Sequence, residues 1–284
     1  MSLQFIIGSS GIGKTHYACE QIIRESMENP QHLYYIIVPE QFTMQTQKNV
    51  VEMHPGKGIL NIDVLSFQRL AYRIFEETGG AREVLLDDTG KSMVLQKLVQ
   101  QHRKNLPYLG SQMNKPGYLD EVKSLISEFM QYDIREEELQ DMLGKTGEDS
   151  LLHMKMQDVG VLYQAFLQYL EGHYMTGEGV MDALKKAIPF SDKLKKSVLL
   201  LDGFTGFTPV QMNVIRELLN VCDKVLVTVT MDAGENPLQL GKPHQLFYMS
   251  RKMIHTLSGL TSNLDDPVLL KDERKGRFGN STSL

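Results

Sequence analysis

The sequence has few of the residues on which disulfide frameworks and zinc sites depend. Its 284 residues include only two cysteines, Cys19 and Cys222, which lie far apart in the chain. Two cysteines alone cannot close a four-ligand metal site, and reduced, unpaired thiols are expected rather than a disulfide framework. The eight histidines are scattered and form neither a His-Glu-x-x-His pattern nor a Cys/His knuckle.

Long apolar runs are also missing. No stretch approaches 18 consecutive apolar residues, and the N-terminus lacks the basic and then apolar layout of a signal peptide. We therefore expect no membrane segment and a cytoplasmic location. The net charge of −5 argues against a protein that coats nucleic acid through bulk electrostatics. A local basic groove would not be visible in that sum, so charge alone does not settle the partners.

With 42% hydrophobic and 23% charged residues, the chain can bury a sizeable core and build more than one module. Residues 1 to about 80 alternate short strands and helices, which is typical of a parallel α/β layer. The sequence predicts strands at Leu3–Ile7, Tyr34–Val38 and Ile59–Leu65, and helices at Thr15–Met27 and Phe67–Glu77.

Strand signals then stop, and residues 85 to 190 show helical periodicity throughout, with apolar residues at three- and four-residue spacing. The α/β pattern resumes with a strand at Val198–Leu201, a helix at Pro209–Asn220 with Thr208 as its N-cap, and a strand at Val225–Thr230. We therefore predict one α/β domain, residues 1–84 and 191–284, interrupted by a helical insertion domain, residues 85–190.

The segment from Asp265 to Leu284 is polar and lacks a strong period. It is either a disordered tail or the point at which the chain stops before a further domain. We favour the second interpretation.

A phosphate-binding loop is predicted directly after the first strand and directly before the first helix. The pattern G-x-x-x-x-G-K-[ST] is satisfied at every fixed position by Gly8, Ser9, Ser10, Gly11, Ile12, Gly13, Lys14 and Thr15. Backbone amides and the helix N-terminus would face the phosphates of a nucleotide, for which we predict ATP. Lys14 would reach the β- and γ-phosphates, and the hydroxyl of Thr15 would bind Mg²⁺.

A carboxylate at the end of a neighbouring buried strand is needed to hold the magnesium shell. Asp202, which follows the apolar run Val198–Leu201, is the candidate. The alternative is an ordinary aspartate at the start of a loop. Many hydrolysing enzymes place glutamate at the next position to orient or deprotonate the attacking water, whereas this chain has Gly203. The sequence thus predicts nucleotide binding with weak hydrolysis.

Three segments carry a resemblance to a known family. The stretch from Asp202 to Gln211 has the length and end-points of the Asp-Glu-x-Gln-Asp-x-x-x-x-Gln motif of UvrD/RecB-like helicases, with the inner acidic and glutamine positions replaced. That substituted form resembles the B subunits of bacterial AddAB helicase-nucleases. The segments Val38–Thr43 and Val64–Tyr72, each after an expected strand, are similar to the same family. The resemblance runs along the whole chain and is weaker in the helical block.

The resemblance implies a RecA-like first helicase domain that carries a helical insertion. It also implies a longer parent protein with a second RecA-like domain and a C-terminal nuclease domain with an iron–sulfur cluster, for which this chain has neither the length nor the cysteines. The chain is therefore expected to be an N-terminal fragment. The family processes double-strand DNA ends for recombinational repair as a heterodimer, in which the A subunit is the main motor and the B subunit scans for the Chi sequence.

DNA contacts are expected where polar and aromatic residues follow strand ends, because ligands of open α/β sheets gather there. An amide, a hydroxyl, a cation and aromatic rings would together suit a single strand. The candidates are Gln41, Thr43, Phe67, Arg69, Tyr72 and Phe207. The alternative is that Phe67 and Phe207 are core residues at helix starts and that Arg69 is a solvated charge; the resemblance favours DNA contact.

Two other functions stay open from the residues alone. One is a P-loop kinase for a small molecule, with the helical block as its lid. Gly203 and the length of the helical block make this function less favoured. The other is a scaffold in which ATP only stabilises the fold.

Overall fold

The computed structural model describes residues 2–80, 83–112, 115, 117–147, 150–232 and 234–271. The chain divides into two compact units. The first, here called the α/β unit, comprises Met1–Gly80, Leu184–Phe207 and Gln211–Leu284, and the second, the helical unit, comprises Ala81–Ala183 and Thr208–Val210. In the described ranges, no helix combines the length and the apolar character needed to cross a membrane.

The α/β unit contains a parallel sheet whose strands lie in the order β3-β2-β6-β7-β1-β8. These strands are β1 (Ser2–Gly8), β2 (Leu33–Ile37), β3 (Ile62–Leu65), β6 (Ser197–Leu201), β7 (Lys224–Thr230) and β8 (Val268–Leu269). The central strands are almost entirely buried, as expected for a parallel sheet covered on both faces. The prediction of an α/β protein with a parallel central sheet is confirmed.

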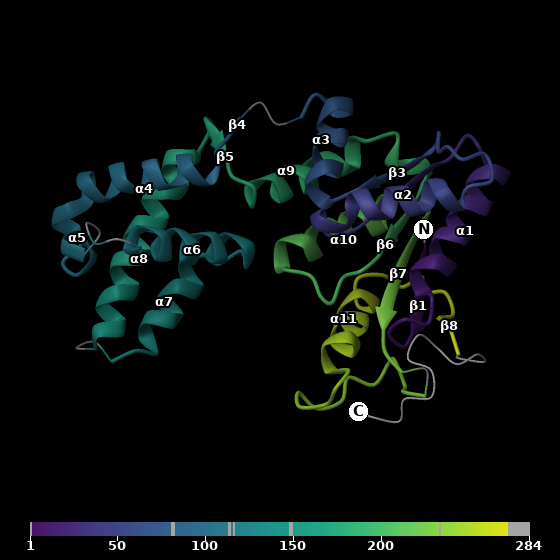
Figure 1. Ribbon diagram of the computed structural model, residues 1–284. Coiled ribbons are helices and arrows are strands. Elements are labelled where there is room, and N and C mark those ends of the chain that lie inside the picture. Colours follow the sequence, from purple (N-terminus) through teal and green to yellow (C-terminus); the bar gives the residue numbers. More distant parts are fainter. Residues whose placement is uncertain are drawn as a thin grey trace. The chain divides into compact units, whose positions relative to one another are not determined.

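Helices cover both faces of this sheet (Figure 1). They are α1 (Lys14–Glu28), α2 (Thr43–Met53), α3 (Phe67–Thr78), α10 (Pro209–Val221) and α11 (Tyr248–Ser258). On the face covered by α1 and α2, Ala18, Cys19 and Ile22 of α1 pack with Ile36 of β2 and Leu200 of β6. Because every strand is parallel, all carboxyl ends lie at one edge of the sheet, where a ligand site is expected.

The α/β unit differs from the sequence prediction in several features. The third strand begins at Ile62 rather than Ile59, because the Asn61 side chain donates hydrogen bonds to the carbonyls of Ser26 and His32, each at 3.1 Å, and fixes the preceding turn. The helices α2 and α11 were not predicted at all. The segment after Asp265 contains strand β8, whose Val268 and Leu269 pair with Ile6 and Ile7; residues 272–284 lie outside the described residues.

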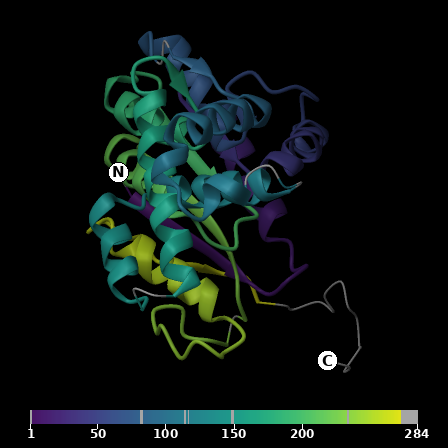
Figure 2. The ribbon, with the colours of Figure 1, turned by 90° about the vertical axis from the view of Figure 1, so that its left-hand side faces the viewer.

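The helical unit consists almost wholly of helices (Figure 1; Figure 2). They are α4 (Asp88–His102), α5 (Leu109–Gln112), α6 (Tyr118–Gln131), α7 (Glu136–Gly144) and α8 (Leu151–Leu170), with α9 (Gly179–Ala187) beginning in this unit. The expectation of no strands here is wrong in one detail: β4 (Val84–Leu85) pairs with β5 (Tyr174–Met175). Strands of two residues are too short to give a period in the sequence.

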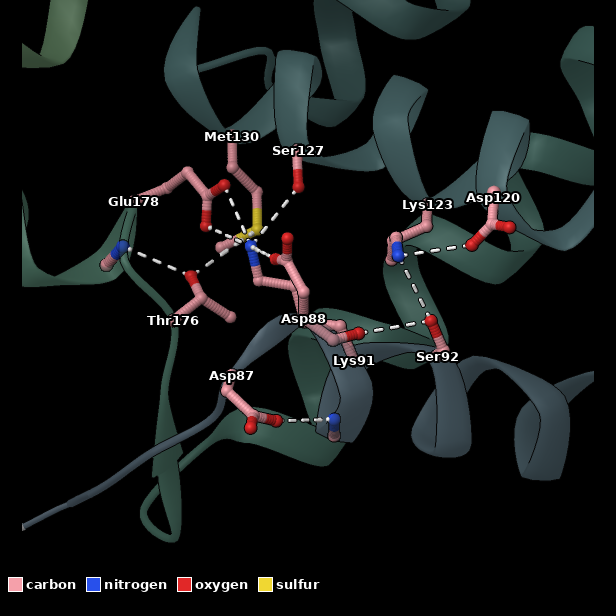
Figure 3. Close-up of polar contacts among 12 residues, drawn as sticks. Asp87, Asp88, Lys91, Ser92, Asp120, Lys123, Ser127, Met130, Thr176 and Glu178 are labelled. Atoms are coloured by element: carbon pink, nitrogen blue, oxygen red, sulfur yellow. Dashed lines mark hydrogen bonds and ion pairs between the residues drawn. The ribbon is translucent and has the colours of Figure 1, made fainter.

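A buried ion pair holds the helical unit together (Figure 3). Lys91 of α4 places its Nζ 3.0 Å from both carboxylate oxygens of Glu178 and donates to Ser127 Oγ at 3.3 Å. The two charged side chains are only 8% and 10% exposed. A charge at this depth is tolerated because its partner and further hydrogen bonds replace the lost water.

Breaking this pair should destabilise the protein strongly. Lys91→Met leaves the Glu178 carboxylate buried without a cation, which costs about 3–5 kcal/mol in comparable pairs. Lys104→Met, at an exposed lysine of the same unit, should change the free energy of unfolding by no more than about 0.5 kcal/mol. Urea unfolding at neutral pH measures both variants, and equal effects would contradict the assignment of Lys91 as a structural anchor.

The same ion pair should make the free energy of unfolding depend on pH in the acidic range. Burial raises the pKa of Glu178, but hydrogen bonding and attraction by Lys91 outweigh it, so the net pKa lies below the ordinary value of 4.5. A carboxyl with a depressed folded-state pKa stabilises the protein above its unfolded value, and this contribution is lost as the pH falls through the folded value. We expect the free energy of unfolding to decrease as the pH is lowered from about 4.5. In Glu178→Gln this component should be missing from the pH profile of the unfolding free energy.

Candidate functional site

The glycine-rich loop turns the chain from β1 into α1. Gly11 and Gly13 have φ values of 78° and 99°, in the left-handed region that favours glycine. In α1, which begins at Lys14, no side chain caps the N-terminus. The first amides of a helix have no partner within the helix, so those of α1 stay available for an anion. The loop residues Ser9, Gly11 and Gly13 are exposed.

Gly8 is required for a different reason, namely close approach. A Cβ atom at Gly8 would lie 2.8 Å from Cγ2 of Ile12 and 3.2 Å from Cβ of Leu270. The end of β1 is therefore packed between the loop itself and the residue that follows β8. A side chain at this position would force Ile12 or Leu270 to shift.

Lys14 lies across the loop it follows. Its Nζ donates a hydrogen bond of 2.8 Å to the backbone carbonyl of Ser9. Burial lowers the pKa of Lys14, and the negative charge of Asp202 partly offsets this effect. The ammonium group thus contacts the backbone of the loop, where it can exchange the Ser9 carbonyl for phosphate oxygens.

A chain of hydrogen bonds joins the first turn of α1 to the end of β6. Thr15 Oγ1 donates to Asp202, with distances of 3.0 and 2.9 Å to the two carboxylate oxygens. Thr228 Oγ1, on the intervening strand β7, donates to Asp202 Oδ1 at 2.6 Å. Asp202 is buried. The sequence-predicted metal pair, Thr15 and Asp202, is therefore brought together although 187 positions separate the two residues.

The donor set fits Mg²⁺ in chemical type. A hydroxyl and a carboxylate are hard oxygen ligands, and Mg²⁺ is usually held by one or two protein groups together with substrate phosphates and water. Among the residues that the structure describes, no group of three or more His, Cys, Asp or Glu side chains could hold a metal alone. Cys19 is no ligand candidate, because burial and the nearby Asp202 raise the pKa of its thiol to about 12.

The residue after Asp202 has a backbone conformation that suits glycine. Gly203 has a φ of 79°, and a Cβ atom there would lie 3.6 Å from Cδ of Pro39. The space is therefore adequate, and the constraint is the left-handed backbone itself. A glutamate at this position would be strained, so the backbone conformation of the turn disfavours a carboxylate side chain here.

A cavity of about 540 Å³ opens beside the phosphate loop. Lys14, Thr15 and Cys19 line it from the side of α1, and Thr46 and Asn49 line it from α2. Sequence reasoning missed the α2 side of this cavity. The only available signal was the spacing of Thr46, Val50 and Met53 on one helix face.

The predicted DNA-contact residues follow the ends of β2, β3 and β6, which are neighbours in the sheet. Gln41 is exposed, and Tyr72 is 38% exposed with its ring 6.2 Å edge-on from that of Phe75. Thr43 is buried and donates to the carbonyl of Glu40. Arg69 is exposed, and its Nε lies 3.1 Å from the carboxylate of Glu40.

An aromatic cluster connects two of these strand ends. Phe67 is buried, and its ring centroid lies 5.6 Å from that of Phe204 and 6.3 Å from that of Phe207. Phe204 and Phe207 are 5.0 Å apart and partly exposed. Phe204 was not predicted, although its spacing of three residues from Phe207 around Gly206 was visible in the sequence. Burial leaves little surface of Phe67 and Thr43 for a ligand, so direct DNA contact by these two stays a prediction.

The left-handed turn at Gly203 generates a stability prediction. Gly203→Ala should lower the free energy of unfolding by about 1–2 kcal/mol, because an L-residue is forced into the left-handed region. Gly206→Ala is the matched control, since no atom lies within 4 Å of its Cβ position and its φ is not in that region. Urea unfolding of both variants measures the difference, and a Gly206→Ala loss as large as that of Gly203→Ala would refute the strain argument.

Comparisons of the sequence with family models and with known proteins agree on one family. The family model described as "ADDB, N-terminal" matches residues 5–284. A protein of Lachnoclostridium phytofermentans, named as the B subunit of an ATP-dependent helicase/deoxyribonuclease, is 44% identical over 292 residues, which cover 100% of this chain and 25% of that protein.

Proteins of the same name from other bacteria match this chain with similar coverage. Those of Alkaliphilus metalliredigens and Geobacillus thermodenitrificans are each 32% identical, with 97% of this chain and 24% of each relative covered. The chain thus spans about a quarter of the length of the relatives it matches. The resemblance inferred from the sequence motifs is confirmed: this chain belongs to the AddB N-terminal family.

Proposed function

We propose that this chain is the ATP-binding and DNA-binding helicase-like part of an ATP-dependent helicase-nuclease subunit. The parent protein would act with an A-type subunit, as a heterodimer in the cytoplasm, on double-strand DNA ends during homologous recombination. Chi scanning is part of this proposal. The proposal rests mainly on the hydrogen bond between Thr15 and Asp202. This bond places a hydroxyl and a carboxylate beside an uncapped helix N-terminus.

In this proposal the α/β unit is a RecA-like P-loop domain and the helical unit is an insertion in it. The amides from Ser9 to Thr15 and the Lys14 ammonium would hold the phosphates of ATP. Thr15 and Asp202 would hold Mg²⁺, which supplies positive charge to the phosphate oxygens when bound. An iron–sulfur cluster is proposed only for a part of the parent protein that these residues do not include.

Weak hydrolysis is part of the same proposal. A general base must lie within hydrogen-bond reach of the attacking water, directly or through one further water. The position after Asp202 is Gly203, whose backbone N–H donates to Thr228 Oγ1 at 3.4 Å, so its main chain is engaged in holding the turn. An arginine from another domain stabilises the transition state in related motors. We therefore propose nucleotide binding, rather than rapid turnover, as the role of these residues.

DNA would bind at the carboxyl ends of β2, β3 and β6. Partly exposed rings at Phe204 and Phe207 offer stacking surfaces, which bind bases without regard to sequence. Arg69 would exchange the Glu40 carboxylate for a DNA phosphate. These contacts lie at the sheet edge that also carries the phosphate loop, so the two ligands would share one rigid scaffold.

Nucleotide binding should depend on Lys14. In Lys14→Ala we expect the affinity for Mg-ATP to fall about 10- to 100-fold, because a charge-assisted hydrogen bond to phosphate is removed. Lys252→Ala, at an exposed lysine of α11, should bind like the unaltered chain. Isothermal titration calorimetry measures both variants. Unchanged ATP affinity in Lys14→Ala would show that the phosphate loop is assigned wrongly.

Coupling between the two ligands separates the proposed function from its alternatives. A thermal-shift titration with Mg-ATP, with and without a single-stranded oligonucleotide, should show that each ligand changes the apparent affinity for the other by the same factor. A scaffold that ATP merely stabilises would show no such coupling. A small-molecule kinase would instead transfer phosphate to a metabolite, and such transfer would contradict the proposal.

A further inference from the structure

The helical unit carries a groove that the proposed nucleotide and DNA sites do not use. One hollow of about 490 Å³ is bordered by the end of α6, by α7 and α8, and by the start of α9. A second hollow of about 440 Å³ lies between α7 and α8. The two hollows adjoin, since both are lined by Glu136, Leu139 and Gln164, and together they are called here the acidic groove.

The floor of the acidic groove is apolar. Leu139 and Tyr163 are buried, and Leu167 is 40% exposed. The apolar lining of the first hollow consists of Met130, Ile134, Leu139, Tyr163 and Leu167. A mixed floor of aliphatic, aromatic and methionine side chains is suited to the apolar face of a partner helix.

The rim of the groove carries more acidic than basic side chains. Four carboxylates border the first hollow, and two of them have cationic partners: Asp133 lies 3.8 Å from Arg135, and Glu178 lies 3.0 Å from Lys91. The carboxylates belong to Asp133, Glu136, Glu178 and Asp182. Helix α7 contains no basic residue, and Glu136 is the acidic residue that it places on the rim. The field of this rim reaches the floor, since burial, Asp133 and Asp182 together raise the pKa of Tyr163 to about 12.

The walls of the groove are fixed by contacts that need no ligand. Glu178 is held by Lys91, and Met130 lies beside the same cluster (Figure 3). Tyr163 donates a hydrogen bond of 3.1 Å to the carbonyl of Ile134. Helices α7 and α8 approach closely at Gly160, where a Cβ atom would meet Cδ2 of Leu139 at 2.9 Å. A preformed groove avoids part of the ordering cost of binding.

We propose that the acidic groove is a docking site for a basic amphipathic helix of a partner protein. The apolar floor would take the apolar face of that helix, and Glu136 and Asp182, which are exposed on the rim, would pair with its arginines or lysines. Nucleic acid does not fit this surface, because its phosphates would meet carboxylates of the same charge. The proposal goes beyond the proposed ATP and DNA functions and does not depend on them.

A designed helical peptide tests this proposal. The probe has leucines on one face at i, i+3, i+4 and i+7 and arginines on both flanks, and a second probe carries glutamates in place of the arginines. Fluorescence anisotropy on the full chain should show binding of the arginine peptide that weakens with salt, and no comparable binding of the glutamate peptide. Equal binding of the two peptides would overturn the proposal.

Matched variants show whether the peptide binds in the groove. Glu136→Lys/Asp182→Lys should weaken binding of the arginine peptide by about tenfold or more, whereas Glu83→Lys/Glu171→Lys, at two exposed acids outside the groove, should change it less than about twofold. Both double variants change the net charge equally. If they weaken binding equally, the peptide responds only to overall charge and the groove is not a docking site.

The apolar floor has its own matched pair. Leu167→Ser should weaken binding, whereas Met93→Ser, at a residue 68% exposed on α4, should not. Circular dichroism and thermal melting confirm that each variant is folded. If Glu136→Lys/Asp182→Lys does not fold, the milder Glu136→Gln/Asp182→Asn replaces it. Unchanged affinity in Leu167→Ser would leave only a charged surface and would contradict helix docking.

Discussion

The hydrogen bonds from Thr15 and Thr228 to Asp202 are the interactions on which the candidate site depends. They join the first turn of α1, the end of β6 and the strand β7 between β6 and β1. Asp202 can be buried as a carboxylate because two hydroxyls donate to it. The parallel register places its strand end beside the phosphate loop, so the sheet converts residues far apart in sequence into one oxygen-rich corner. Gly8, Gly13 and Lys14 lie in the loop next to that corner.

The local parts of this arrangement could be predicted from the sequence. The phosphate loop is a contiguous pattern between an apolar strand and a helix, and the strand before Asp202 is a run of buried aliphatic residues. Helix α2 was missed because its buried face includes Thr43 and Thr46, which do not register as apolar in a periodicity analysis. Strand β8 was missed because two residues give no alternation. The ion pair between Arg69 and Glu40 was also beyond the sequence, because it depends on which strands are neighbours.

The two units use buried charge in different ways. In the α/β unit, Asp202 is held by neutral hydroxyls, so its charge stays available to a cation. In the helical unit, Lys91 neutralises Glu178 directly, and the pair serves as an anchor. Other carboxylates of this unit, such as Glu136 and Asp182, are exposed beside an apolar floor. This surface suits a cationic protein segment rather than DNA.

The central proposal is that main-chain amides from Ser9 to Thr15 hold the phosphates of a nucleotide. The most direct measurement is a titration of ¹⁵N-labelled protein with Mg-ATP, followed by amide chemical shifts. The account predicts saturable shifts concentrated at Gly13, Lys14 and Thr15, with a smaller response at Thr228 through Asp202. Saturable shifts that leave these amides unmoved and cluster elsewhere would contradict it.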